Sequence, residues 1–395
     1  MPVSPVSPVS VVLGVTGSIA AFKSAELARR LSAKGFEVSV VMTESARRFI
    51  APLTFETITR RKVFTSLWDD PLSHIELAAA DLVLVAPATA NVIGKAASGI
   101  GDDLLSTILI AAGSKTVFAP AMNTRMLHNP AVRANIARLS AIGCLIVPPE
   151  SGSLACGEEG EGRLASIDEI VLYAEKALKT QDMRGEKVLI TSGPTREPID
   201  PVRFISNRSS GKMGAAIARE AFRRGADVTI VTGPTGAFIP RAVNCVRVET
   251  AVQMCDAVMA EIASATIAVM AAAVADYSPV HVSPDKPPKI AGGTRIELET
   301  TPDILHEAGK LQNRPFLVGF SAETGQRIDR ATDKMRKKAA DMMVFNNVTL
   351  QGAGFDADTN IITIIDRAGG MVEYPIMSKD DAASAILDHA ALLRS

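Results

Sequence analysis

The sequence predicts an α/β protein made of two doubly wound, mainly parallel-sheet domains of the Rossmann-like kind. Apolar, β-branched runs alternate with helical patterns along almost the whole chain. One such unit recurs, because GFEVSVVMT at 35–43 resembles GADVTIVTG at 225–233, and each follows an arginine-bearing helical pattern. With 395 residues, 47% of them apolar, and 28 glycines, the chain is long enough for two domains with separate cores.

Composition narrows the class of protein. The net charge of −1 argues against a nucleic-acid partner, which would require a basic face. The four cysteines are widely spaced without a CxxC pair, which favours a reducing compartment and disfavours a zinc site. The N-terminus shows no signal-peptide pattern, and the apolar stretch 9–22 is too short and too interrupted to span a bilayer. We therefore expect a cytoplasmic protein with no membrane partner.

The first predicted domain covers residues 11–180. Residues 1–10 contain PVS three times over and predict a disordered tail, since prolines forbid a helix and the composition offers no core. Strands are predicted at 11–15, 38–42, 82–86, 116–119 and 145–147, with a first helix ending before Gly35 and a last helix at 166–179. Residues 181–186 are polar and predict a linker.

The second predicted domain covers residues 187–395 and follows the same pattern. Strands are predicted at 188–190, 227–232, 246–248, 267–270, 316–320 and 342–345, a hairpin at 361–365 and 371–374, and helices at 215–223, at 327–340 and from about 380.

The loop 191–214 of this domain is the strongest candidate for a phosphate site. It lies between a strand and a helix, where free N–H groups and the helix dipole attract an anion. Ser209, Ser210 and Gly211 stand where the helix begins, and Lys212 adds a positive charge. The loop is not a P-loop, because Met213 replaces the magnesium-binding Ser or Thr. An ordinary capped helix is the alternative.

Several polar residues of the first domain follow predicted strands. The turn 14–18 opens a helix but reads GxxG rather than the dinucleotide pattern, so it is compatible with a nucleotide or flavin phosphate without specifying one. The residues Thr89, Asn91, Lys95 and Asn123 follow later strands and are candidate ligand contacts or, alternatively, helix caps. His74, in SHIEL, is either a base near neutral pH or an ordinary surface residue.

Two further loops carry ionisable groups. The glycine-rich segment 151–163 predicts a mobile flap with one thiol, Cys156, whereas the other three cysteines lie beside apolar residues. Asp276 follows the strand 267–270 and suits a magnesium ion or a ribose hydroxyl. Lys286 and Lys289, in the long loop that follows, are either ligand contacts or solvated lysines.

Taken together, these motifs resemble a known family. They are GVTGSIAAFK, SHIEL, PATANVIGK, PAMNTRM, GSLACGEEGEGR, SGPTREPIDPVRFISNRSSGKMG, AAVADY, GFSAET and a lysine-rich helix before an Asn-rich strand end. In this order they resemble the bifunctional coenzyme A biosynthesis flavoproteins, in which phosphopantothenoylcysteine decarboxylase is fused to phosphopantothenate–cysteine ligase. The resemblance covers residues 11–395.

For the first domain, the resemblance implies an FMN-dependent, homo-oligomeric cysteine decarboxylase. The cysteine moiety of 4′-phospho-N-pantothenoylcysteine would be oxidised to a thioaldehyde-like species, lose carbon dioxide and be reduced again to 4′-phosphopantetheine. His74 matches the active-site histidine, Asn123 the asparagine that holds the substrate carboxylate, and Cys156 the cysteine that helps return the proton. The implied FMN contacts are Gly17, Ser18, Thr43, Thr89, Asn91 and Lys95.

For the second domain, the resemblance implies a CTP-dependent ligase. 4′-Phosphopantothenate would attack the α-phosphate of CTP, and the amine of L-cysteine would then displace CMP from the acyl-cytidylate. Asn207 matches the residue required for turnover of that intermediate, and Lys286 matches an essential lysine. The implied nucleotide contacts are Ser210, Gly211, Lys212, Asp276, Lys286, Phe320 and Lys338, with Asp276 also near Mg²⁺.

Two positions depart from the family pattern. The KxKK run reads Lys286–Pro287–Pro288–Lys289, which puts loop mobility and CTP affinity in question, and the usual Asn-Asp reads Asn346–Asn347, which would remove a carboxylate contact. The resemblance also implies an oligomer, which we expect to be a dodecamer. The alternatives are an NAD-dependent flavoprotein oxidoreductase, a non-catalytic flavin-binding regulator, and a protein with only one active half.

Overall fold

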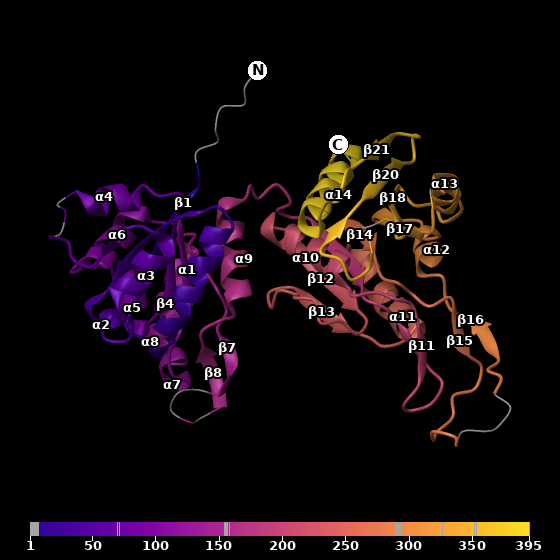
Figure 1. The fold of residues 1–395 in the computed structure, drawn as a ribbon, viewed down its shortest axis with the longest axis horizontal. Helices are drawn as coiled ribbons and strands as arrows, with labels where there is room; N and C mark the ends of the chain where they lie inside the picture. The colour runs from indigo at the N-terminus through magenta and orange to yellow at the C-terminus, as the bar shows by residue number, and fades with distance from the viewer. Residues whose placement is uncertain are drawn as a thin grey trace. The chain divides into compact units, whose positions relative to one another are not determined.

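The computed structural model describes residues 8–68, 70, 72–153, 157, 159–288, 294–325, 327–350, 352 and 354–394. The chain divides into two compact units, Met1–Thr180 and Gln181–Ser395 (Figure 1). Each unit contains a mainly parallel sheet with helices on both faces, so the predicted α/β class is confirmed.

The sheet of the first unit is entirely parallel, with the order β3-β2-β1-β4-β5-β6. Its strands are β1 (Ser10–Val15), β2 (Glu37–Met42), β3 (Val63–Phe64), β4 (Leu82–Ala88), β5 (Thr116–Pro120) and β6 (Leu145–Ile146). The predicted disordered tail is too long by at least one residue, because Ser10 pairs with Glu37 and its hydroxyl donates to Asp81 over 2.8 Å. Residues 1–7 lie outside the described part of the chain.

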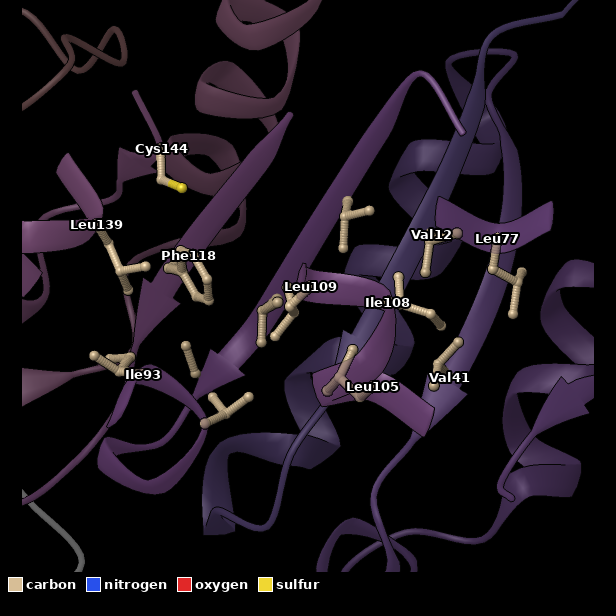
Figure 2. Close-up of a cluster of buried hydrophobic side chains, with 14 of the residues drawn as sticks. Val12, Val41, Leu77, Ile93, Leu105, Ile108, Leu109, Phe118, Leu139 and Cys144 are labelled. Atoms are coloured by element: carbon tan, nitrogen blue, oxygen red, sulfur yellow. The ribbon is translucent and has the colours of Figure 1, made fainter. Parts of the chain in front are cut away.

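Helices cover both faces of this sheet. They are η1 (Ile19–Phe22), α1 (Lys23–Ala33), α2 (Glu44–Arg47), α3 (Pro52–Thr59), α4 (Ser73–Ala78), α5 (Ala90–Ser98), α6 (Leu104–Ala112), α7 (Thr124–Leu127), α8 (Pro130–Ala141) and α9 (Ile167–Leu178). Helices α1, α3 and α9 pack on one face. On the other, Leu105, Ile108 and Leu109 of α6 fill the space over Val12 and Val41 (Figure 2). This burial holds the carboxyl ends of β1 and β4 in place.

The glycine-rich segment predicted as a mobile flap contains a β-hairpin. Strand β7 (Glu150–Ser153) pairs antiparallel with β8 (Glu159–Arg163). The glycines permit close packing of this hairpin: Gly162 has φ +127°, and a Cβ there would lie 2.2 Å from the carbonyl oxygen of Met122. The hairpin therefore rests on the loop that follows β5.

The sheet of the second unit has eight strands in the order β13-β12-β9-β14-β17-β18-β20-β21, and only β20 and β21 are antiparallel to their neighbours. Its strands are β9 (Lys187–Ser192), β12 (Asp227–Thr232), β13 (Asn244–Arg247), β14 (Ile267–Met270), β17 (Phe316–Glu323), β18 (Met342–Asn347), β20 (Ile362–Asp366) and β21 (Met371–Glu373). Three two-stranded ribbons accompany it: β10 (Arg196–Pro198) with β11 (Phe204–Ser206), β15 (Tyr277–Pro279) with β16 (Leu298–Thr300), and β19 (Thr359–Asn360) with β22 (Met377–Ser378).

Helices cover this second sheet in the same way. They are α10 (Lys212–Arg223), α11 (Ala251–Glu261), η2 (Ile262–Ser264), α12 (Ile304–Gly309), α13 (Ile328–Lys337) and α14 (Lys379–Arg394). Helices α10 and α14 lie together over one face, whereas α11, α12 and α13 bury their apolar residues on the other.

The predicted linker 181–186 packs on the second unit. Met183 is buried and its N–H donates to the carbonyl of Arg224 over 3.0 Å, and Asp182 pairs with the Arg224 guanidinium at 2.5 Å. Among the helices described, none is both long and apolar enough to cross a membrane.

Candidate functional site

A cavity of about 960 Å³ opens in the second unit at the carboxyl ends of its parallel strands. The strand order changes direction between β9 and β14, and such a position is where open α/β sheets bind ligands. The cavity gathers most of the residues that the sequence predicted for this half. These are Asn207, Ser210, Gly211, Lys212, Asp276, Phe320 and Lys338.

The N-terminus of α10 forms one wall of this cavity. Gly211 is its N-cap with φ +72°, and a Cβ there would lie 2.5 Å from the Thr235 hydroxyl oxygen. No side chain caps the first turn of the helix. Of the two serines before Gly211, Ser210 donates through its hydroxyl to the carbonyl of Phe355 over 2.5 Å, and Ser209 accepts from the Gly211 N–H over 3.3 Å. Backbone N–H groups of the first turn therefore face the cavity, as in anion sites.

Two lysines form another wall of the cavity: Lys334 in α13 and Lys338, the C-cap of that helix. Lys338 pairs with Asp303 at 2.8 Å, and the Lys334 ammonium donates to the carbonyl of Phe320 over 2.8 Å. Burial, together with the nearby charge of Lys338, lowers the pKa of Lys334. We did not predict Lys334, although its i, i+4 spacing from Lys338 placed both on one helix face.

Carboxylates balance these cations. Asp276 and Asp303 both line the cavity. Burial alone would raise the pKa of Asp303, but hydrogen bonds from Lys338 and from the His306 N–H lower it. Within the described residues, no group of three or more His, Cys, Asp or Glu side chains is arranged to hold a metal ion. Asp276 and Asp303 are two cavity carboxylates that could share a magnesium ion with water and with the phosphate oxygens of a ligand.

Asn207 enters the cavity from the loop before α10. Its side-chain amide donates to the carbonyl of Val274 over 2.8 Å. That bond joins the loops after β9 and β14 and fixes the direction of the Asn207 side chain. Its carbonyl oxygen is then left as the group that can accept from a ligand.

The two departures from the family pattern have different consequences. Lys286 is exposed and does not line the cavity; it lies on the arm whose ends are held by β15 and β16, and Lys289 is outside the described residues. Asn347 keeps the acceptor role, because its Oδ1 accepts from the Gly325 N–H (3.2 Å), the Thr349 N–H (3.1 Å) and the Thr349 hydroxyl (2.7 Å). The Asn-for-Asp change therefore retains an acceptor oxygen at this position.

In the first unit, three predicted cofactor segments meet at the carboxyl ends of β1, β2 and β4. The Thr16 hydroxyl donates to Pro87 over 2.7 Å and accepts from the Thr89 N–H over 3.2 Å. A Cβ on Gly17 would lie 2.4 Å from the Cβ of Ser45, so this turn touches the start of α2. Ser18 and Thr43 cap η1 and α2 respectively. The N-termini of η1 and α2 and the loop at Thr89 therefore lie together at the carboxyl ends of β1, β2 and β4.

Asn91 and Lys95 lie on α5, which follows Thr89. Asn91 is exposed in the first turn of the helix. Lys95 binds the carboxylates of Asp102 and Asp103 at 2.7 and 3.0 Å, and these bonds raise its pKa. In this arrangement its ammonium is neutralised within the chain, and a phosphate would have to compete with both carboxylates.

Asn123 lies beside the β7–β8 hairpin. It caps α7 by accepting from the Arg125 N–H over 2.8 Å. The hairpin reaches the same loop, since the Met122 N–H donates to Gly162 over 2.9 Å and the Thr124 hydroxyl donates to Glu161 over 2.7 Å. Cys156 lies between β7 and β8 in sequence, and its position is outside the described residues.

His74 is in the first turn of α4 rather than before the helix, and it stands apart from these groups. Helix α4 precedes the amino end of β4, whereas Asn123 follows the carboxyl end of β5, and Figure 1 shows α4 and α7 at opposite ends of the unit. The Nδ1 atom of His74 is buried and has no hydrogen-bond partner among the described residues. One chain therefore does not bring His74 to Asn123.

Comparisons with known proteins match both units. Residues 4–179 match the Flavoprotein family, and residues 183–393 match the family of the DNA/pantothenate metabolism flavoprotein C-terminal domain. The coenzyme A biosynthesis bifunctional protein CoaBC of Bacillus subtilis is 44% identical over 97% of this chain and 96% of its own, and that of Escherichia coli K12 is 42% identical over 95% of each.

Among solved structures, the C-terminal domain of a coenzyme A biosynthesis bifunctional protein is 39% identical, with a TM-score of 0.47, over 54% of this chain and 99% of its own. The full-length identity and the order of the two matched domains confirm the resemblance inferred from the motifs. The chain belongs to the family of bifunctional coenzyme A biosynthesis flavoproteins, enzymes that join a phosphopantothenoylcysteine decarboxylase to a phosphopantothenate–cysteine ligase.

Proposed function

We propose that the second unit ligates 4′-phosphopantothenate to L-cysteine with CTP and Mg²⁺, and that the first unit decarboxylates the product with FMN. The observation that carries the ligase assignment is a cavity of the second unit in which a helix N-terminus and four lysines meet two aspartates. Activation of a carboxylate by a nucleotide requires cations around a triphosphate, and this cavity supplies them.

In the ligase reaction, the α10 N-terminus and Lys212 would bind phosphate oxygens, and Lys334 and Lys338 would neutralise further negative charge. Asp276 would share a magnesium ion with the triphosphate. Asn207, whose direction is fixed by Val274, would meet the acyl-cytidylate. Lys286 remains a prediction: its arm would have to fold toward the cavity before the lysine could act there.

The ligase assignment is tested with Asn207→Asp. This change replaces the donor to Val274 by a carboxylate and places a negative charge beside the mixed anhydride. We expect acyl-cytidylate to accumulate, measured by quenched-flow mass spectrometry, while the same protein still decarboxylates supplied 4′-phospho-N-pantothenoylcysteine. Unchanged ligase turnover would contradict the role of Asn207.

In the decarboxylase, the residues fit a flavin at the carboxyl ends of β1, β2 and β4. The turn at Gly17 and Ser18, together with Thr43 and Thr89, would hold FMN, with Asn91 and Lys95 nearby on α5. FMN, when bound, supplies an acceptor for the electron pair of the substrate cysteine and returns it after carbon dioxide has left. The helix N-termini offer N–H groups for a phosphate.

Asn123 would hold the substrate carboxylate, and the hairpin beside it would close over the substrate and bring Cys156 to it. We expect Cys156→Ser to retain the flavin, seen as unchanged visible absorbance, but to stop at an oxidised and decarboxylated product. Undiminished formation of 4′-phosphopantetheine would remove Cys156 from the mechanism.

A second copy of this chain would complete the decarboxylase site. His74 is remote from Asn123 within one unit, and exposed apolar side chains surround both His74 (Leu72, 61% exposed; Ile75, 57%) and the cofactor turn (Ile19, 58%; Phe22, 60%). Such side chains are suited to burial between subunits. We propose a homo-oligomer, specifically the dodecamer that the family resemblance implies, in the cytoplasm.

Subunit complementation tests this sharing. His74→Gln and Asn123→Ala each remove one group, so each variant alone is expected to be inactive as a decarboxylase. Co-assembled from one cell, the two variants would form some sites with both groups intact and regain a measurable fraction of the activity. Inactive mixed oligomers, with assembly confirmed by native mass spectrometry, would contradict a shared site.

A further inference from the structure

The segment Gly354–Asp358, which precedes β19, lies against the N-terminus of α10. The Ser210 hydroxyl donates to the Phe355 carbonyl over 2.5 Å. The Lys212 ammonium donates to the Asp356 carbonyl over 2.8 Å and pairs with the Asp358 carboxylate at 2.7 Å. The segment is therefore bonded to two of the residues that we assign to phosphate binding.

Lys379, the first residue of α14, holds the same segment from the other side. Its ammonium donates to the carbonyls of Phe355 (3.1 Å) and Ala357, and its own N–H donates to the Asp358 carbonyl over 3.0 Å. Lys379 is only 7% exposed and lines the cavity. A buried ammonium needs hydrogen-bond partners, and these carbonyls supply them.

The two ammonium groups lie close together on this wall. Burial, followed by the positive charge of Lys212, lowers the pKa of Lys379. The Asp358 carboxylate that offsets this charge is 89% exposed, so it is held only weakly by its surroundings. A phosphate-bearing ligand at the α10 N-terminus would bring further negative charge to this pair of lysines.

We propose that Lys379 is a positioning residue of the ligase reaction. It fixes Gly354–Asp358 as a wall of the cavity, and the wall in turn holds Ser210 and Lys212 where phosphate oxygens meet them. This inference rests on the ligase function proposed above. A free lysine side chain samples many rotamers, so a fixed Lys212 loses less entropy when the ligand binds.

The test is Lys379→Met, which keeps an unbranched side chain one atom shorter and removes its charge and its donors. Loss of two charge-assisted hydrogen bonds from the wall predicts a rise in the KM and the Kd for CTP of about tenfold to a hundredfold. The kcat at saturating CTP should change by less than about threefold, because chemistry proceeds once the ligand is bound. Lys379→Arg keeps cationic donors and should recover most of the affinity.

Three measurements separate positioning from a general loss of structure. Decarboxylation of supplied 4′-phospho-N-pantothenoylcysteine by the same protein reports on the folding of the first unit. Arg224→Met removes another buried cation that joins α10 to α14, through Asp388 at 2.6 Å, and should leave the Kd for CTP unchanged. In Lys212→Met/Lys379→Met, the two losses of affinity should not add, because Lys379 acts through Lys212.

Calorimetric titration with CTP and with inorganic pyrophosphate completes the test. If the wild type binds CTP but forms no pyrophosphate, the ligase proposal fails. The ratio of the Kd for CTP in Lys379→Met to that in the wild type still decides whether Lys379 positions the binding site. An unchanged Kd in Lys379→Met, additive losses in the double variant, or a wild type that binds neither probe would each overturn the inference.

Discussion

The hairpin that carries Cys156 offers the sharpest test of the decarboxylase account. Gly162→Ala adds a Cβ that would lie 2.2 Å from the backbone carbonyl oxygen of Met122, at a residue with φ +127°. Backbone atoms on both sides cannot yield as a flexible side chain can. The variant must therefore move β8 away from the loop that holds Asn123.

The size of the effect follows from the contacts that break. Separation removes the Met122–Gly162 and Thr124–Glu161 hydrogen bonds, each worth roughly 1 kcal/mol net, so docking weakens by about 2 kcal/mol. Since 1.4 kcal/mol corresponds to about a factor of ten, the equilibrium constant for docking should fall about thirtyfold. The kcat/KM for decarboxylation should fall with the docked population, by at most the same factor.

Gly152→Ala is the matched control for this prediction. Gly152 lies on the same hairpin with φ +153°, and the nearest atom to an added Cβ is Nη1 of the flexible Arg163 side chain, at 3.4 Å. It therefore introduces backbone strain in the hairpin without the clash at Met122. Carbon dioxide release from supplied substrate measures the decarboxylase, and pyrophosphate release from the second unit serves as the internal standard. Equal decarboxylation by the two variants would refute the docking argument.

Two further predictions concern the second unit. Burial and Lys338 lower the pKa of Lys334, so at alkaline pH below the ordinary lysine pKa of about 10.4 the unfolded chain binds more protons than the folded chain. Over that range the free energy of unfolding should gain a contribution that rises with pH. Urea unfolding should show that Lys334→Met removes this contribution, and an identical pH dependence in both proteins would contradict it. Asn347→Asp keeps the Oδ1 acceptor and should hold ligase kcat/KM within about twofold. Asn347→Ala leaves the donors unpaired and should lower the free energy of unfolding by about 1–3 kcal/mol. Equal stability of the two variants would show that the acceptor is dispensable.

The sequence was most informative where local pattern decides structure. The strand 267–270 was predicted with its observed bounds, and the helix predicted to end before Gly35 does so, because Gly35 adopts φ +87°. Apolar periodicity and glycine positions are local signals, and parallel topology then brings the strand ends together. This is why most of the predicted ligase residues line one cavity.

The remaining features depend on contacts between residues far apart in sequence. Phe355 reaches Ser210 across 145 positions, and nothing in the sequence around Lys379 marks it as buried. The hairpin of β7 and β8 was predicted only as a flap, since its glycines have meaning through the loop they touch. The SHIEL motif indicated a helix start near His74, although the residue lies inside the helix rather than before it. Its separation from Asn123 depends on which end of the sheet each residue precedes or follows.

The central claim is that the second unit forms 4′-phospho-N-pantothenoylcysteine and the first unit then decarboxylates it. The decisive measurement supplies the purified protein with 4′-phosphopantothenate, L-cysteine, Mg²⁺ and either CTP or ATP, and follows pyrophosphate, carbon dioxide and 4′-phosphopantetheine together. We predict that CTP supports all three, with one carbon dioxide and one 4′-phosphopantetheine for each pyrophosphate. Carbon dioxide only from supplied 4′-phospho-N-pantothenoylcysteine, with no pyrophosphate from either nucleotide, would contradict it.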